Sequence, residues 1–198
     1  AAPAFADFSA EAAGLFNNVR VPAALLTGAI LPLGFFAAPR LSNGDKPWLA
    51  KVKQVHLVTA SLALCCQLVS IMWSTIAVNK LAETVSAPSA GVMQLLERDY
   101  ELAWVGTNVN FILGLLSFAA SLITFALISF GPMRRSAVCM ISAAILLMLS
   151  IVNEGVAQGD GTESGVRFGS NLSTLFLRYV VLLLQKMVSG RPLVLGSL

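Results

Sequence analysis

Few side chains in this 198-residue sequence could do chemistry, and the first to consider is His56, the only histidine. A single histidine excludes a haem held by two histidines and a three-histidine metal site, so we expect no haem. One imidazole nitrogen could still bind the magnesium of a chlorophyll, which needs only one protein ligand. The alternative is a histidine that hydrogen-bonds to water or to a lipid headgroup.

Two further residues are candidates for contact with a cofactor. Asn108 stands beside Thr107 and Asn110 near the start of an apolar stretch, where it could bind a lipid, a pigment or a neighbouring helix. Contacts between helices are the simpler interpretation of these amides. Glu154 ends another apolar stretch and is either a ligand or a solvated carboxylate. The candidate cofactor-binding residues are therefore His56, Glu154 and Asn108.

The sequence predicts neither a metal site nor catalysis. Glu97, Asp99 and Glu101 could hold a divalent cation, but Arg98 interrupts them and a solvated face is the simpler interpretation. We find no nucleophile elbow, phosphate-binding loop or pair of catalytic carboxylates. The three cysteines lie within apolar runs, where we expect them to be small buried residues. We therefore expect a protein that is not an enzyme.

The composition indicates an integral membrane protein. Hydrophobic residues make up 57% of the chain, only 12% of residues are charged, and the mean hydropathy is +0.79. A soluble domain of this size needs about twice as many charged residues to cover its surface. The net charge of +3 comes from scattered residues and forms no basic stripe, so we expect no nucleic-acid partner.

The candidate residues must be positioned by helices, and we predict an all-α membrane domain over residues 1–198. Four apolar stretches between charged residues are long enough to cross a membrane. Pro22 is expected at the start of the first span, and Pro32 should kink it. Pro47 should begin the second helix, and Gly131-Pro132 should end the third. The predicted spans are residues 21–39, 54–79, 103–131 and 136–157.

A fifth stretch, residues 171–188, carries Arg178 at its centre, which is costly to bury in a bilayer. Arg178 falls with other polar residues on one side of a helical wheel. Leucines and aromatic residues occupy the rest of the wheel. The pattern predicts an amphipathic helix lying in the membrane interface.

Loop charges predict an orientation. The loops at 40–53 and 134–135 are basic, whereas the loop between the second and third spans is acidic. The positive-inside rule places the basic loops on the cytosolic or stromal side and both termini on the opposite side. Trp48, Trp73 and Trp104 stand near predicted span ends, as interfacial anchors do.

Three short stretches carry a family resemblance. Residues 1–6 (Ala-Ala-Pro-Ala-Phe-Ala) have the small-residue pattern of ends left after import or translocation. With residues 16–22 (FNNVRVP) and 97–104 (ERDYELAW), they resemble plastid membrane proteins of algae and plants. More loosely, they resemble small accessory subunits at the edges of algal photosystem–antenna supercomplexes. The chain lacks the paired Glu/Arg signature of light-harvesting proteins, so no functional residue is carried over.

Together these observations predict a non-catalytic accessory subunit of a larger membrane complex. The resemblance implies a photosystem–antenna supercomplex in a thylakoid, with core or antenna proteins, membrane lipids and a few chlorophylls or carotenoids as partners. One alternative is a small transporter or channel in which Gln67, Asn108 and Asn110 line a polar path. Another is an assembly factor for a membrane complex.

Overall fold

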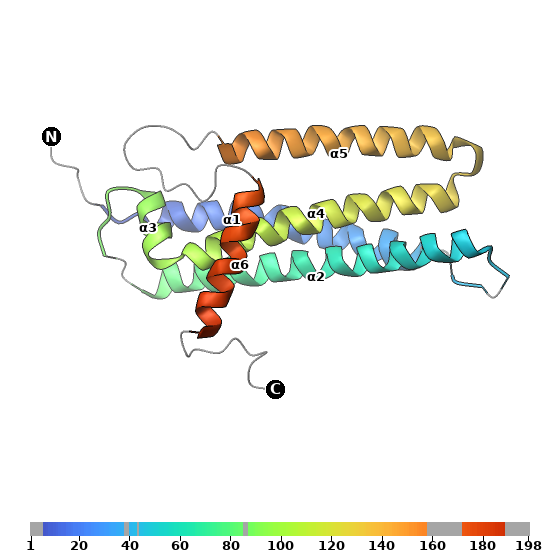
Figure 1. Cartoon of the computed structure of the whole chain (residues 1–198). Coiled ribbons are helices and arrows are strands. Elements are labelled where there is room, and N and C mark those ends of the chain that lie inside the picture. The colour runs from blue at the N-terminus through green and yellow to red at the C-terminus, as the bar shows by residue number, and fades with distance from the viewer. Residues whose placement is uncertain (1–5, 38–39, 43, 85–86, 158–171, 189–198) are drawn as a thin grey trace. The chain divides into compact units, whose positions relative to one another are not determined.

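The computed structural model describes residues 6–37, 40–42, 44–84, 87–157 and 172–188. Helices contain 89% of these residues, and no strand occurs among them. The predicted all-α fold is confirmed (Figure 1).

Four helical segments of the described chain are long and apolar enough to cross a membrane, as predicted. Their presence indicates an integral membrane protein. They are α1 (Ser9–Leu31) with its continuation η1 (Pro32–Phe36), α2 (Pro47–Glu83), α4 (Glu101–Ser129) and α5 (Arg134–Ala157).

The first helix begins well before the predicted span. The helix α1 begins at Ser9 rather than at residue 21, and the carboxylate of Asp7 accepts hydrogen bonds from the backbone and hydroxyl of Ser9. The charged Arg20 bounds the apolar stretch of the sequence, but it lies within the helix. Pro22 is consequently inside α1 and not at its start.

The other predicted helix start, helix end and helix break are observed. Pro32 interrupts α1, and the chain continues as one π-helical turn. Pro47 begins α2. The helix α4 ends before Gly131, which has a positive φ of 48° that glycine adopts without a steric penalty.

The chain forms two compact units, and the long helices contribute to both. The first unit comprises Ala1–Asn18, Trp73–Val109 and Val152–Leu198. The second unit comprises Val19–Met72 and Asn110–Ile151.

The core of the first unit forms where the short helix α3 (Val92–Asp99) packs against α1, α2 and α4. Leu95 and Leu96 of α3 are fully buried with Phe16 of α1. Phe16 also meets Trp104 edge to face, with ring centroids 5.4 Å apart. The backbone leaves helical geometry at Tyr100, so α3 does not run continuously into α4.

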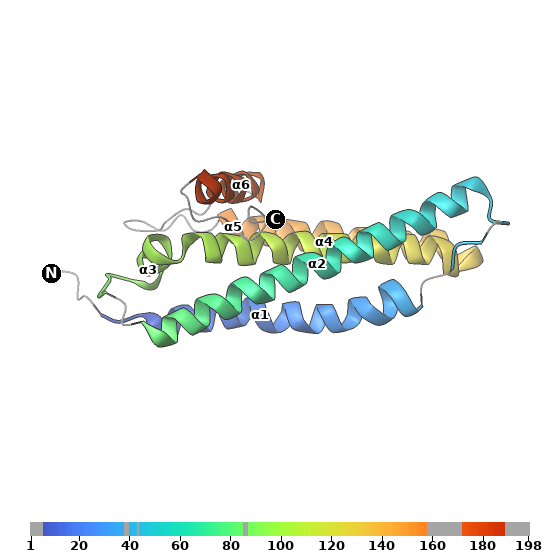
Figure 2. The same cartoon turned by 90° about the horizontal axis from the view of Figure 1, so that it is seen from below.

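The helix α6 (Leu172–Val188) also belongs to the first unit and lies against the start of α4 (Figure 1, Figure 2). Arg178, predicted on the polar side of this helix, forms an ion pair with Glu101 of α4. Tyr179 lies beside Gly106, where a Cβ would be 3.1 Å from both the Tyr179 and the Trp73 rings. Glycine at position 106 therefore allows the Tyr179 and Trp73 rings to pack directly against the backbone of α4.

In the second unit, α1, α2 and α4 pack against one another. A Cβ built at Gly34 of η1 would lie 2.8 Å from that of Ala60, so η1 and α2 touch closely there. Ile30, Ala63 and Phe118 form a small core between the three helices. By contrast, no side chain of α5 between Arg134 and Val152 is fully buried.

Candidate functional site

A stripe of mostly small or polar side chains runs along the buried face of α2. Its members are separated by alternating steps of four and three residues, which places them on one face of a helix. Their small size lets a neighbouring backbone approach closely. They are His56, Ala60, Ala63, Gln67, Ser70, Ser74, Ala77 and Leu81, all buried.

The helix α4 carries a matching stripe. The two helices run antiparallel, because the start of the α2 stripe contacts the end of the α4 stripe in the second unit. We call the two stripes together the polar seam; each unit contains its own section of it. The α4 members are Thr107, Asn110, Gly114, Ser117, Ser121 and Thr124.

His56 occupies one end of the polar seam and is 2% exposed. Its Nδ1 lies 3.0 Å from the backbone oxygen of Ser121 and 3.1 Å from the hydroxyl oxygen of Thr124. A carbonyl oxygen only accepts hydrogen bonds, so we assign the imidazole proton to Nδ1. The Nε2 atom then carries a lone pair, and it is buried with no hydrogen-bond partner among the described residues.

The chemistry of His56 suits a ligand to a chlorophyll magnesium, since the hydrogen bond from Nδ1 to a carbonyl orients the ring as it does in metal-binding histidines. The space around Nε2, however, does not suit a chlorophyll. Nε2 is closed off by surrounding protein atoms, and the Phe125 ring lies 6.0 Å from the imidazole. A chlorophyll macrocycle does not fit against Nε2 in this packing.

Gln67 fills the middle of the polar seam in the second unit and is fully buried. Its amide nitrogen donates to the backbone oxygen of Phe111 at 3.2 Å. Its amide oxygen is buried and has no hydrogen-bond partner among the described residues. The amide lies over Gly114, whose missing side chain supplies the space.

The three predicted cofactor-binding residues do not form one site within either unit. Asn108 belongs to the first unit, is half-buried, and donates its side-chain amide to the backbone oxygen of Trp104 at 2.8 Å. The hydroxyls of Ser74 and Thr107 lie 3.4 Å apart and do join two helices there. Glu154 falls in α5, but its side chain lies outside the described residues.

Two of the acidic residues around α3, Asp99 and Glu101, pair with arginines. The Asp99 carboxylate lies 2.8 Å from Arg98, which raises the pKa of that guanidinium, and Glu101 pairs with Arg178. In the described part of the chain, no three histidine, cysteine or acidic residues come together as a metal site. Of the three cysteines, only Cys66 is buried, whereas Cys65 and Cys139 are exposed.

Sequence reasoning missed the polar seam, although its signal is visible in the printed sequence. The sequence does show small residues paired at four-residue spacing, such as Ser117 and Ser121, which predict close helix packing, and it indicated Gln67 and Asn110 for a possible polar path. Neither pattern outlined a continuous stripe. The alternation of four- and three-residue steps over 26 residues, from His56 to Leu81, would have shown the whole stripe on α2.

Comparisons with protein-family models, with curated proteins and with solved structures find no match.

Proposed function

We propose that this protein is a non-catalytic accessory subunit of a larger membrane complex. The observation that carries the proposal is the exposure of α5, which is apolar enough to cross a membrane yet buries no side chain fully from Arg134 to Val152. Such a helix gains little from its own chain and more from close packing against another membrane protein. Its most exposed large side chains are Met140, Leu146, Leu147 and Ile151.

The polar seam supports a scaffold role. His56 and Gln67 each donate to a backbone oxygen of α4, and such bonds between helices fix how the two helices are rotated against each other. The described parts of the spans hold no pair of carboxylates near their middle of the kind that proton-coupled transporters use. A rigid α2–α4 pair would leave the outer faces of α2 and α5 for a neighbour.

The alternative of a transporter or channel requires the same polar residues to line a path. In the second unit, Gln67, Asn110 and Ser117 are buried against the neighbouring helix, and Gln67 fills the space over Gly114. This packing favours the scaffold. A flux assay in liposomes containing the purified protein separates the two functions, because only a transporter raises flux above that of empty vesicles.

We further propose that the complex is a photosystem–antenna supercomplex in a thylakoid, on the resemblance of the short stretches described above. The basic loops would face the stroma and both termini the lumen. The helix α6 would lie in the membrane interface, since the ion pair between Arg178 and Glu101 lowers the cost of placing an arginine there. Chlorophyll, carotenoid and lipid would contact exposed apolar faces rather than His56. An assembly factor would bind the same partners transiently.

Site-specific photocrosslinking in native membranes tests the accessory role. A photoreactive amino acid at Leu147, which is 64% exposed on α5, should crosslink to another membrane protein. The same group at Ala126, which is fully buried, is the matched control and should give no such product. Crosslinks from position 147 to lipid alone would contradict the proposal.

A further inference from the structure

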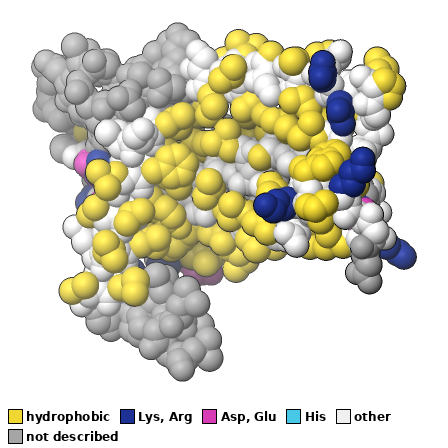
Figure 3. Space-filling view, turned by 45° about the vertical axis from the view of Figure 1, so that its right-hand side comes forward, with side chains coloured by type: hydrophobic (Ala, Val, Ile, Leu, Met, Phe, Trp, Pro, Cys, Tyr) yellow, Lys and Arg dark blue, Asp and Glu magenta, His cyan; other side chains and the backbone are white. Residues whose placement is uncertain are grey.

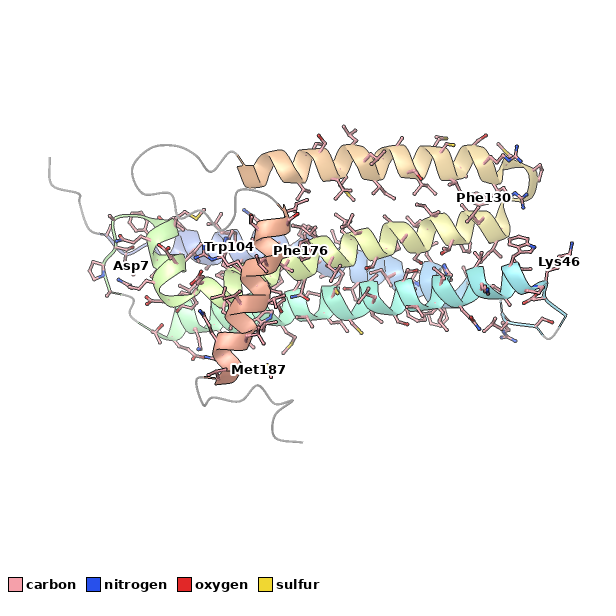
Figure 4. All side chains as sticks on the ribbon, viewed as in Figure 1. Asp7, Lys46, Trp104, Phe130, Phe176 and Met187 are labelled. Carbon is pink, nitrogen blue, oxygen red and sulfur yellow. The ribbon has the colours of Figure 1, made fainter. Side chains whose placement is uncertain are left out.

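One end of the second unit gathers exposed basic side chains. The end of α1, the start of α2 and the turn between α4 and α5 all lie at this end (Figure 1, Figure 2). Figure 4 labels Lys46 and Phe130 there, and Figure 3 shows the Lys and Arg side chains standing among hydrophobic ones. We call this surface the basic rim. Its five exposed cations are Arg40, Lys46, Lys51, Arg134 and Arg135.

The second unit contains almost no negative charge to balance the basic rim. Asp45 is its only acidic residue. The Asp45 carboxylate lies 2.7 Å from Nζ of Lys53, which also donates to the backbone oxygen of Arg40 at 2.8 Å. Lys53 therefore neutralises Asp45. The five rim side chains have no ion pair or hydrogen bond with any other described residue.

Exposed apolar side chains accompany these cations at the ends of the candidate spans. Phe36 is 83% exposed where η1 ends, and Met133 is 71% exposed before α5. Trp48 and Phe130 are also exposed, at the start of α2 and after α4. A helix that crosses a membrane places such positions at headgroup depth, where cations meet lipid headgroups and aromatic rings meet the acyl boundary.

We propose that the basic rim binds the headgroups of anionic lipids. The cations come from the ends of three different spans, α1 with η1, α2 and α5, and stand among exposed apolar side chains. This arrangement suits lipids, because each lipid supplies a negative headgroup and an acyl chain. An acidic protein would complement the charges but not the apolar side chains between them. The proposal depends on the four helices crossing a membrane and is independent of the accessory role.

The test measures binding of a fluorescent phosphatidylglycerol, and of its zwitterionic phosphatidylcholine counterpart, to the full chain purified in a neutral detergent. The anionic lipid should bind more tightly, and its affinity should fall as salt is added. Neutralising Lys46, Lys51, Arg134 and Arg135 together with glutamine should weaken anionic binding by about fivefold for each cation removed.

Two matched variants keep the result interpretable. Lys80→Gln removes an exposed cation from the first unit and should leave binding unchanged. Exchanging Lys46 and Lys51 for arginine keeps the charge and should keep the affinity. Gel filtration and the helical circular dichroism signal check that each variant is folded.

Equal affinity for the two lipids would overturn the proposal, as would full anionic binding by the variant that lacks four cations. Loss of an acidic protein partner from that variant, with lipid binding intact, would show that the rim binds protein instead. If the chain proves not to be a subunit of a larger complex, lipid binding by the rim should still be observed, so the two proposals fail separately.

Discussion

The side-chain amide of Gln67 on α2 lies in the space that a side chain would take at Gly114 on α4. A Cβ at Gly114 would be 2.6 Å from the Gln67 amide nitrogen, a distance that real Cβ atoms essentially never show, and 3.0 Å from its amide carbon. The same amide nitrogen donates to the backbone of Phe111 one turn earlier. The two helices are therefore held together by a polar side chain inserted over a glycine.

This relationship predicts the effect of Gly114→Ala. The added methyl group would push against a fully buried amide, and overpacking of this kind costs about 1–3 kcal/mol of unfolding free energy. Chemical denaturation of the purified protein in mixed micelles measures the loss. The control is Gly28→Ala, since a Cβ at Gly28 has no neighbour within 4 Å.

A second substitution shows whether Gly114→Ala destabilises the protein through its contact with Gln67. Gln67→Ala removes the amide that the new methyl group would strike, so the double variant should be more stable than the sum of the two single losses predicts. Strictly additive losses would show that Gln67 and Gly114 do not interact.

His56→Ala should lower the unfolding free energy by about 2 kcal/mol, because it removes the bond to Ser121 and leaves a space between two helices. It should leave the visible absorption spectrum of the purified complex unchanged, since no macrocycle fits against Nε2. Loss of one chlorophyll per chain would show instead that His56 is a pigment ligand.

The ion pair between Arg178 and Glu101 should anchor α6 to α4. The two side chains are 33% and 23% exposed, so solvent screens their attraction and we expect a coupling of about 1 kcal/mol. A double-mutant cycle with Glu101→Gln and Arg178→Gln measures it. Protease cleavage within α6 should also become faster in each single variant, and unchanged cleavage would mean that the apolar contacts hold α6 alone.

The loop before α2 should respond to acid through Asp45. The hydrogen bond from Lys53 holds the pKa of Asp45 below its ordinary value of 3.8, and the backbone of Ser42 adds a second bond. The contribution of this carboxylate to stability is therefore full above pH 3.8 and is lost as the pH falls through the lowered pKa. A difference in thermal stability between the wild-type protein and Asp45→Asn should be present at neutral pH and shrink in strong acid. A difference that is constant over this range would contradict the assignment.

The four long apolar helices and most of their ends could be predicted, because hydropathy and proline or glycine signals act locally. The start of α1 could not, since Arg20 was counted as a boundary although the helix extends from Ser9 through it. A charged residue ends an apolar stretch of sequence without ending a helix. Apolar stretches that are bounded by charged residues therefore indicate candidate membrane spans better than they indicate where helices begin.

The polar seam was only partly predictable. Small residues at four-residue spacing indicated close packing, and Ser117 and Ser121 do lie in the seam. Which helices pair could not be read from one sequence, because the contact of His56 with Ser121 joins residues 65 positions apart. The same holds for Arg178 and Glu101, which are 77 positions apart and whose pairing no local pattern indicates.

The accessory role is tested most directly by solubilising native membranes in a gentle detergent and separating the complexes on a density gradient. Mass spectrometry locates this protein in the fractions and gives its stoichiometry, and the absorption spectrum of each fraction reports bound pigment. We expect near-stoichiometric migration with a large chlorophyll-containing membrane complex. Migration as a small, colourless particle would contradict the account.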